Sequence, residues 1–130
     1  MFNPQTFVLV ILVSLLGGFG AVLRAMVARW NGKLPWGILV ANTLGSLVLG
    51  FAITLQVPGS GFAPAVIVIG VLLASGFAGG FTTFSTWAQQ TANFVAAKDY
   101  KLAFYNLGLN LVFPIVGVLA GFFAASLLLK

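Results

Sequence analysis

The chain has 130 residues, of which 61% are hydrophobic and 5% charged, with six basic side chains against one acidic one. It contains no histidine and no cysteine, and Asp99 is its only acidic residue, so it offers no catalytic triad, acid/base pair, metal cluster or disulfide framework. This composition is typical of an integral membrane protein that is not an enzyme. The basic residues are dispersed among apolar segments, which argues against a nucleic-acid-binding stripe.

Four apolar segments are long enough to cross a bilayer, which takes roughly 20 residues in a helix. They cover about residues 7–28, 36–57, 64–97 and 101–129 of one membrane domain, 1–130. Turn-rich connectors separate the first three, and Pro114 is a candidate kink in the fourth. We therefore predict an all-α integral membrane fold with four transmembrane helices.

The third segment is about a dozen residues too long for one straight span. Near its centre, a glycine pair, Gly79 and Gly80, precedes the hydroxyl cluster at residues 82–86. We predict two half-helices around a break near Gly79–Thr83. Main-chain groups released by such a break cannot face lipid, because each unpaired group costs several kcal/mol there. The break should therefore line a cavity or bind a ligand.

Basic residues predict the orientation of the bundle. Four spans place the first and third connectors on one side, with Arg29, Lys33, Lys98 and Lys101. Both termini, with Lys130, and the second connector, which includes Ser60, lie on the other side. The positive-inside rule then places both termini outside.

Small residues recur at helical spacing along three segments, as is typical of close helix packing in membranes. Such residues are Gly17, Ala21 and Ala25; Ser46 and Gly50 with Asn42; and Gly117, Gly121 and Ala125. We interpret these stripes mainly as packing within the chain. Because a protein of this size cannot enclose a large pore alone, we also expect self-association or a partner subunit.

Several polar residues leave two interpretations open. Asn42 lies mid-span, and Asn106 and Asn110 share a face one turn apart, so they could bind helices together or line a polar pathway. Arg24 could snorkel to the interface or supply positive potential to an aqueous vestibule.

Aromatic residues also admit two interpretations. Phe81, Phe84 and Trp87 recur every third residue, and we expect them on the half-helix that follows the break. Such a stripe is usually packing. Alternatively, the positive edges of its rings could contact an anion weakly, which is what conduction requires.

Together these motifs resemble the Fluc (CrcB-type) fluoride channels, in the order that the family has them. They are GGFGAVLR at residues 17–24, PWG at 35–37 with VANTLG at 40–45, and GFAGGFTTFST at 76–86, within a chain of similar length and span number. The similarity covers the first three segments well and the fourth poorly.

The resemblance implies an antiparallel dimer with two narrow fluoride pores at the subunit interface. It also implies a structural sodium ion (Na⁺) at the centre of the dimer interface, held by the main-chain carbonyls of Gly79 and Thr82. The family's arginine, pore asparagine and first pore phenylalanine fall at Arg24, Asn42 and Phe84. With Ser85, Trp87 and Asn110, these are our candidate pore or anion-binding residues.

Departures from the family pattern concern one wall of that pore. The second phenylalanine is replaced by Trp87, the acidic residue three positions later by Gln90, and a tyrosine and two serines by Asn106, Asn110 and Pro114. Only Asn110 keeps a comparable hydrogen-bonding ability near a serine position. These changes suggest the hypothesis of a heterodimer with an oppositely oriented homologue, and a homodimer stays open beside it.

Two other function classes remain as alternatives. A non-conducting structural or regulatory membrane subunit would explain the altered wall. A small multidrug exporter would share the size and span number, but it requires a carboxylate inside the membrane, and Asp99 lies in a connector.

Overall fold

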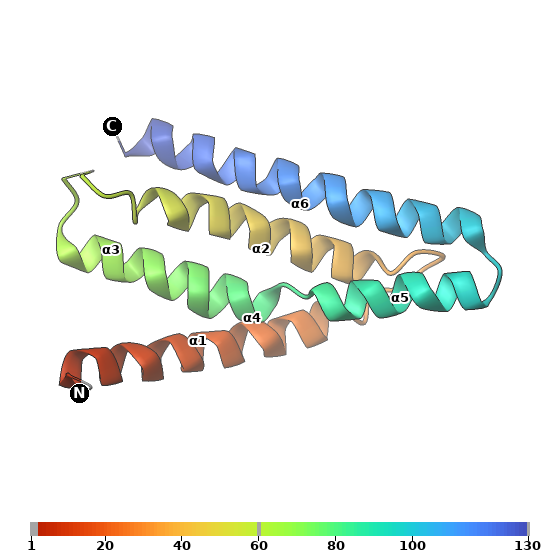
Figure 1. Ribbon diagram of the computed structural model, residues 1–130, viewed down its shortest axis with the longest axis horizontal. Coiled ribbons are helices and arrows are strands. Elements are labelled where there is room, and N and C mark those ends of the chain that lie inside the picture. Colours follow the sequence, from red (N-terminus) through yellow and green to blue (C-terminus); the bar gives the residue numbers. More distant parts are fainter. Residues whose placement is uncertain (1–2, 60, 130) are drawn as a thin grey trace.

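The computed structural model describes residues 3–59 and 61–129, and every regular element within them is a helix. The elements are α1 (Pro4–Val27), α2 (Trp36–Thr54), α3 (Pro64–Val71), the π-helix η1 (Leu72–Ala78), α4 (Gly79–Phe81), α5 (Phe84–Ala96) and α6 (Tyr100–Leu128) (Figure 1). Lys130, Ser60 and the terminal amine, which entered the predicted topology, lie outside the described residues.

Four helical stretches are long and apolar enough to cross a membrane, namely α1, α2, the composite stretch Pro64–Ala96 and α6. This confirms the all-α, four-span fold class. The start of α1, the end of α6 and the connector between α2 and α3 lie at one end of the bundle, and the other two connectors lie at the opposite end (Figure 1).

Local side-chain chemistry sets where the helices begin. The Asn3 side chain accepts a hydrogen bond from the Gln5 N–H (2.6 Å), and Pro4 occupies the first turn of α1. The Asp99 carboxylate accepts from the Leu102 N–H (3.1 Å) and so caps α6. These acceptors bind N–H groups that have no partner within their own helix.

The third span is interrupted within the predicted range, Gly79–Thr83, and the break lies after the glycine pair. Gly79 and Gly80 belong to the helical turn α4, and Gly79 has helical dihedral angles (φ −59°, ψ −39°). The chain becomes extended only at Thr82 (φ −88°, ψ 158°) and Thr83 (φ −152°, ψ 125°). The prediction of a break near Gly79–Thr83 is therefore confirmed, and the extended residues are the last two of that range.

Close packing explains why glycine is present beside the break. A Cβ added to Gly80 would collide with the Gly17 carbonyl, which belongs to α1. The helix preceding the break can therefore approach the main chain of α1 directly. Before the break, the wider η1 replaces regular α-helix over seven residues.

The α2 and α6 helices pack through a second set of glycines. A Cβ on Gly50 would collide with the Val118 carbonyl, one on Gly121 with the Leu47 carbonyl, and one on Gly117 would lie 2.6 Å from the Thr43 carbonyl. Ser46 borders the same contact, since its Cβ would lie 3.5 Å from a Cβ on Gly117. Ala21, the other small residue of the predicted packing set, is half-buried on α1. This packing fixes α6 beside α2 and so places its asparagines near the break.

We predict that Gly121→Ala destabilises the protein, because the added methyl group must push α6 away from α2. Overpacking of this kind costs about 1–3 kcal/mol. Gly108→Ala is the matched control, since a Cβ there meets nothing within 4 Å and Gly108 also lies inside α6. Denaturant titration in detergent micelles measures both, and equal free energies of unfolding for the two variants would contradict the packing account.

Candidate functional site

Asn42 holds the main chain at the break. Its Oδ1 accepts a hydrogen bond from the Thr83 N–H (2.8 Å), and its Nδ2 donates to the Thr83 carbonyl (3.1 Å). In a continuous helix, the Thr83 N–H would donate to the Gly79 carbonyl instead. The amide of Asn42 therefore acts as a substitute peptide group, and the Gly79 carbonyl loses its helical donor.

Arg24 holds the other residue of the break. Its guanidinium donates from Nη1 to the Thr82 carbonyl (3.0 Å), and Arg24 is half-buried. This contact speaks against snorkelling to the interface, because the side chain is turned to the main chain of the bundle. A charge-assisted hydrogen bond of this kind is stronger than one between neutral groups. The positive potential that Arg24 would supply to a vestibule stays a prediction.

A ladder of buried asparagines continues from Asn42 along α6. Asn42 Nδ2 also donates to Asn110 Oδ1 (3.3 Å), and Asn110 Nδ2 donates to both the carbonyl and Oδ1 of Asn106 (3.2 Å each). Asn106 Nδ2 donates in turn to the Thr91 hydroxyl on α5 (2.9 Å). Since an amide has two N–H donors, those of Asn42 and Asn110 are fully committed to the protein.

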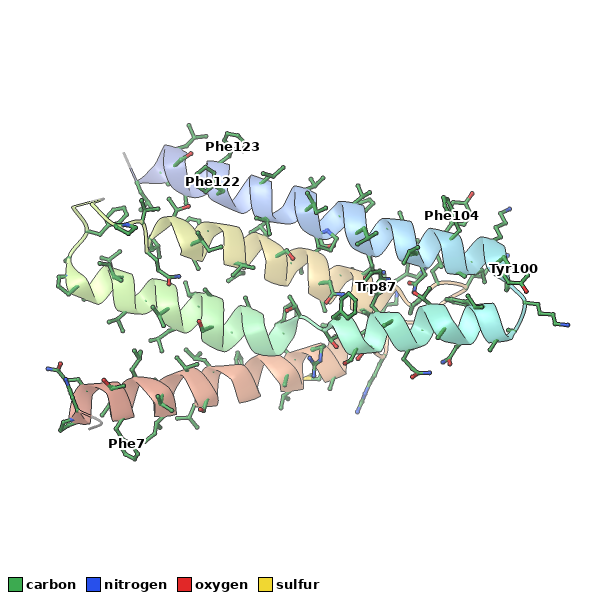
Figure 2. All side chains as sticks on the ribbon, viewed as in Figure 1. Phe7, Trp87, Tyr100, Phe104, Phe122 and Phe123 are labelled. Atoms are coloured by element: carbon green, nitrogen blue, oxygen red, sulfur yellow. The ribbon has the colours of Figure 1, made fainter. Side chains whose placement is uncertain are left out.

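Trp87 is part of the same ladder. It is 7% exposed, its Nε1 donates to the Asn106 carbonyl (3.0 Å), and Figure 2 shows it turned from α5 into the bundle. Phe84, in contrast, is 74% exposed, and its ring meets that of Trp87 edge to face, with centroids 4.9 Å apart. Phe84 therefore presents a free ring surface, whereas Trp87 is fixed behind it.

Phe81 does not share this arrangement. It lies in α4, before the break, where it is buried and stacks on Phe77 with centroids 5.3 Å apart. The predicted stripe of three aromatics after the break is therefore wrong, because the extended residues at 82–83 separate Phe81 from the other two.

Hydroxyl groups gather at the start of α5. The Thr83 hydroxyl accepts from the Thr86 N–H and lies 3.1 Å from the Thr86 hydroxyl and 3.3 Å from that of Ser85. Ser85 is exposed, and with Thr86, Gln89 and Gln90 it lines a cavity of about 350 Å³. The cluster both caps α5 and leaves rotatable O–H donors at the surface.

A cavity of about 380 Å³ gathers most of the predicted site residues. Those that line it are Asn42, Ser46, Gly79, Thr82, Phe84, Trp87 and Asn110, together with Thr83 and Pro114. Arg24 and Ser85 lie just outside its lining, and each is hydrogen-bonded to a residue within it. Gly17, Gly50, Gly117 and Gly121 lie at helix contacts instead, and Ala21 is half-buried on α1.

A second, apolar cavity of about 560 Å³ lies between α5 and α6, and Phe84 and Trp87 line both cavities. The two aromatic residues therefore border both the chamber at the break and an apolar groove. Thr91 lines this groove, and its role as a partner of Asn106 was not predicted from the sequence. Its position one turn after Trp87, on an apolar face, is the signal that could have revealed it.

The sequence matches the family model described as CrcB-like protein, Camphor Resistance (CrcB), over residues 11–122. It is 38% identical over 106 residues to the fluoride-specific ion channel FluC 1 of Symbiobacterium thermophilum, with 77% of this chain and 83% of the relative covered. It is 39% identical over 115 residues to FluC 1 of Rubrobacter xylanophilus, covering 84% and 81%. The FluC of Clostridium novyi is 30% identical over 125 residues, covering 90% and 93%. With this match across all four spans, the chain belongs to the CrcB family.

Proposed function

We propose that the protein is a subunit of a fluoride-selective channel through which cytoplasmic fluoride leaves the cell passively. The names of its relatives support the choice of ion. The observation that carries the proposal is the interrupted third span, where Asn42 holds extended main chain beside a cavity and the free ring of Phe84. Interrupted main chain at membrane depth is tolerated where it lines such a cavity.

Fluoride would cross the aromatic wall by weak contacts with the positive edge of the Phe84 ring and with the hydroxyl groups at the start of α5. Contacts of this kind replace water without trapping the ion, so conduction can continue. Asn42 and Asn110 would act mainly by fixing the walls, because each donor they have is used within the ladder. Trp87 is held in place by its bond to Asn106 and would form the rigid side of the constriction.

A structural sodium ion at the break fits part of the donor set. The Gly79 carbonyl lacks its helical donor and lines the cavity, and hard cations prefer such oxygen ligands. The Thr82 carbonyl accepts from Arg24 but has a second lone pair. When bound, the ion would supply positive charge near the path of the anion.

An antiparallel dimer, with both termini outside, would complete the site. The Phe84 ring and the Ser85 hydroxyl are exposed at the depth of the break, where a second subunit would cover them. The altered α6 wall favours an oppositely oriented homologue as that subunit, since the amide donors of Asn42 and Asn110 are not available to an anion.

A non-conducting structural subunit is the second candidate function. The asparagine ladder favours it, because the amide donors of Asn42 and Asn110 are used within the protein. The multidrug-exporter alternative has less support. Such a protein needs a carboxylate within the membrane, whereas Asp99 lies between α5 and α6 and caps α6.

In proteoliposomes that also contain the oppositely oriented homologue, Phe84→Ala should lower fluoride efflux at least about tenfold, because the ring edge that replaces water is lost. Phe104→Ala is the matched control, since Phe104 is 73% exposed and points outward from α6 (Figure 2). A fluoride electrode measures the flux. Unchanged flux in Phe84→Ala would support the structural-subunit alternative.

Asn42→Ala should loosen the break itself, because a buried N–H left without a partner costs about 1–3 kcal/mol. Hydrogen–deuterium exchange in detergent should then be about tenfold faster at the peptide containing Thr83. Asn93→Ala serves as control, because Asn93 is exposed on α5 and its side chain accepts a hydrogen bond from Gln89 of the same helix. Equal exchange at Thr83 in both variants would contradict the proposed role of Asn42.

The heterodimer is tested by purifying this chain alone and measuring fluoride efflux from liposomes. We expect little flux until an oppositely oriented homologue is co-expressed. Efflux from the chain alone that matches the mixed sample would overturn the heterodimer and leave the homodimer.

A further inference from the structure

The hydroxyl of Ser46 takes no part in the hydrogen-bond network at the break. Ser46 lies on α2, one turn after Asn42 and on the same face of the helix. Both residues line the chamber, the cavity of about 380 Å³ beside the break. Within residues 3–59 and 61–129, the Ser46 hydroxyl has no hydrogen-bond partner. A polar group in this state inside a membrane span indicates a function other than packing.

Other hydroxyl groups within the spans are bonded to their own helix. Four of them donate to the main-chain carbonyl four residues earlier, over 2.7–3.2 Å, namely those of Ser14, Thr43, Thr54 and Thr91. A hydroxyl in a membrane helix gains from this bond, because lipid offers it no acceptor. For Ser46 the corresponding acceptor is the Asn42 carbonyl, and the hydroxyl does not bind it. Its hydrogen is therefore available to a ligand.

The Ser46 hydroxyl is also accessible. Ser46 is half-buried, and in the described part of the chain the one buried side-chain polar atom without a partner is Oε1 of Gln90. The unbonded Oγ of Ser46 is therefore not sealed within the packed helices. Since Ser46 lines the chamber, the chamber is the space from which a ligand can reach this hydroxyl.

The other side-chain donors of the chamber have acceptors within the protein. Both hydrogens of each amide, Asn42 and Asn110, are used in the ladder. Three further donors are bonded over 2.9–3.1 Å, namely the hydroxyls of Thr82 and Thr83 and the indole of Trp87. Among the described side chains that line the chamber, Ser46 thus carries the one polar hydrogen that is not bonded.

The charge closest to the chamber is positive. The Arg24 guanidinium donates to the carbonyl of Thr82, which lines the chamber. The only acidic side chain of the sequence, Asp99, lies between α5 and α6, where it caps α6. A free donor near a fixed positive charge favours an anion as the ligand.

We propose that Ser46 is a fluoride-binding residue of the chamber, and that its hydroxyl donates to the ion in place of a water molecule. This inference rests on the proposed function and gives Ser46 a role beyond the helix packing that its spacing predicts. A small halide loses water most readily where another hydroxyl replaces it. One such donor does not enclose the ion, so the ion can leave again.

Ser46→Ala tests the proposal, because alanine removes the hydroxyl and breaks no hydrogen bond within the subunit. In proteoliposomes that also contain the oppositely oriented homologue, fluoride efflux measured with a fluoride electrode should fall at least about fivefold. The apparent melting temperature of the purified complex in detergent should equal that of the wild type, since the protein loses no internal bond.

Ser14→Ala is the matched control. Ser14 also lies within a span, but its hydroxyl is bonded to the Val10 carbonyl and it does not line the chamber. Its fluoride efflux should equal that of the wild type.

Three results would count against the inference. Equal efflux from the wild type and Ser46→Ala overturns it and leaves the channel as proposed. Lower efflux from Ser46→Ala together with a lower melting temperature or a dissociated complex also overturns it, because the hydroxyl then serves contacts between protein groups. If the wild-type mixture carries no fluoride, the proposed function and this inference fail together.

Discussion

The paired hydrogen bonds between the Asn42 side chain and the main chain of Thr83 are the contact on which the rest of the site depends. An extended stretch of main chain at membrane depth has no water to bind its polar groups, so an unpaired break would be strongly destabilising. The amide of Asn42 presents the same donor and acceptor as a neighbouring peptide group. One side chain on α2 thereby makes possible a break on a different span, and Arg24 adds a second tether from α1.

Three of the residues that differ from the family pattern, Trp87, Asn106 and Asn110, are physically connected to one another. Trp87 donates to Asn106, and Asn106 accepts from Asn110, which in turn accepts from Asn42. Such a set behaves as a unit, because removing one member leaves the next with an unpaired buried group. The changes in α5 and α6 therefore amount to one altered wall, built around hydrogen bonds within the protein. They are not separate losses of pore residues.

Sequence patterns predicted the four spans, the interruption of the third and the common face of Asn106 and Asn110, since each depends on length, composition or helical period. They located the interruption only to the range Gly79–Thr83, and they placed Phe81 on the wrong side of it. Glycine is typical both of flexible main chain and of close helix contact. The collision of an added Cβ on Gly80 with the Gly17 carbonyl shows that Gly80 serves helix contact. The bond from Arg24 to Thr82 joins residues 58 positions apart, and that from Asn106 to Thr91 joins two different helices, so local patterns carry little information about them.

The asparagine ladder that binds the main chain at the break consists of amide, hydroxyl, main-chain and indole groups. None of the side chains of Asn42, Thr83, Asn110, Asn106, Thr91 and Trp87 gains or loses a proton under cellular conditions. Acidification of the medium therefore leaves the charge of this scaffold as it was. A protein exposed to a weak acid that crosses the bilayer and dissociates inside would keep the same internal geometry throughout that exposure.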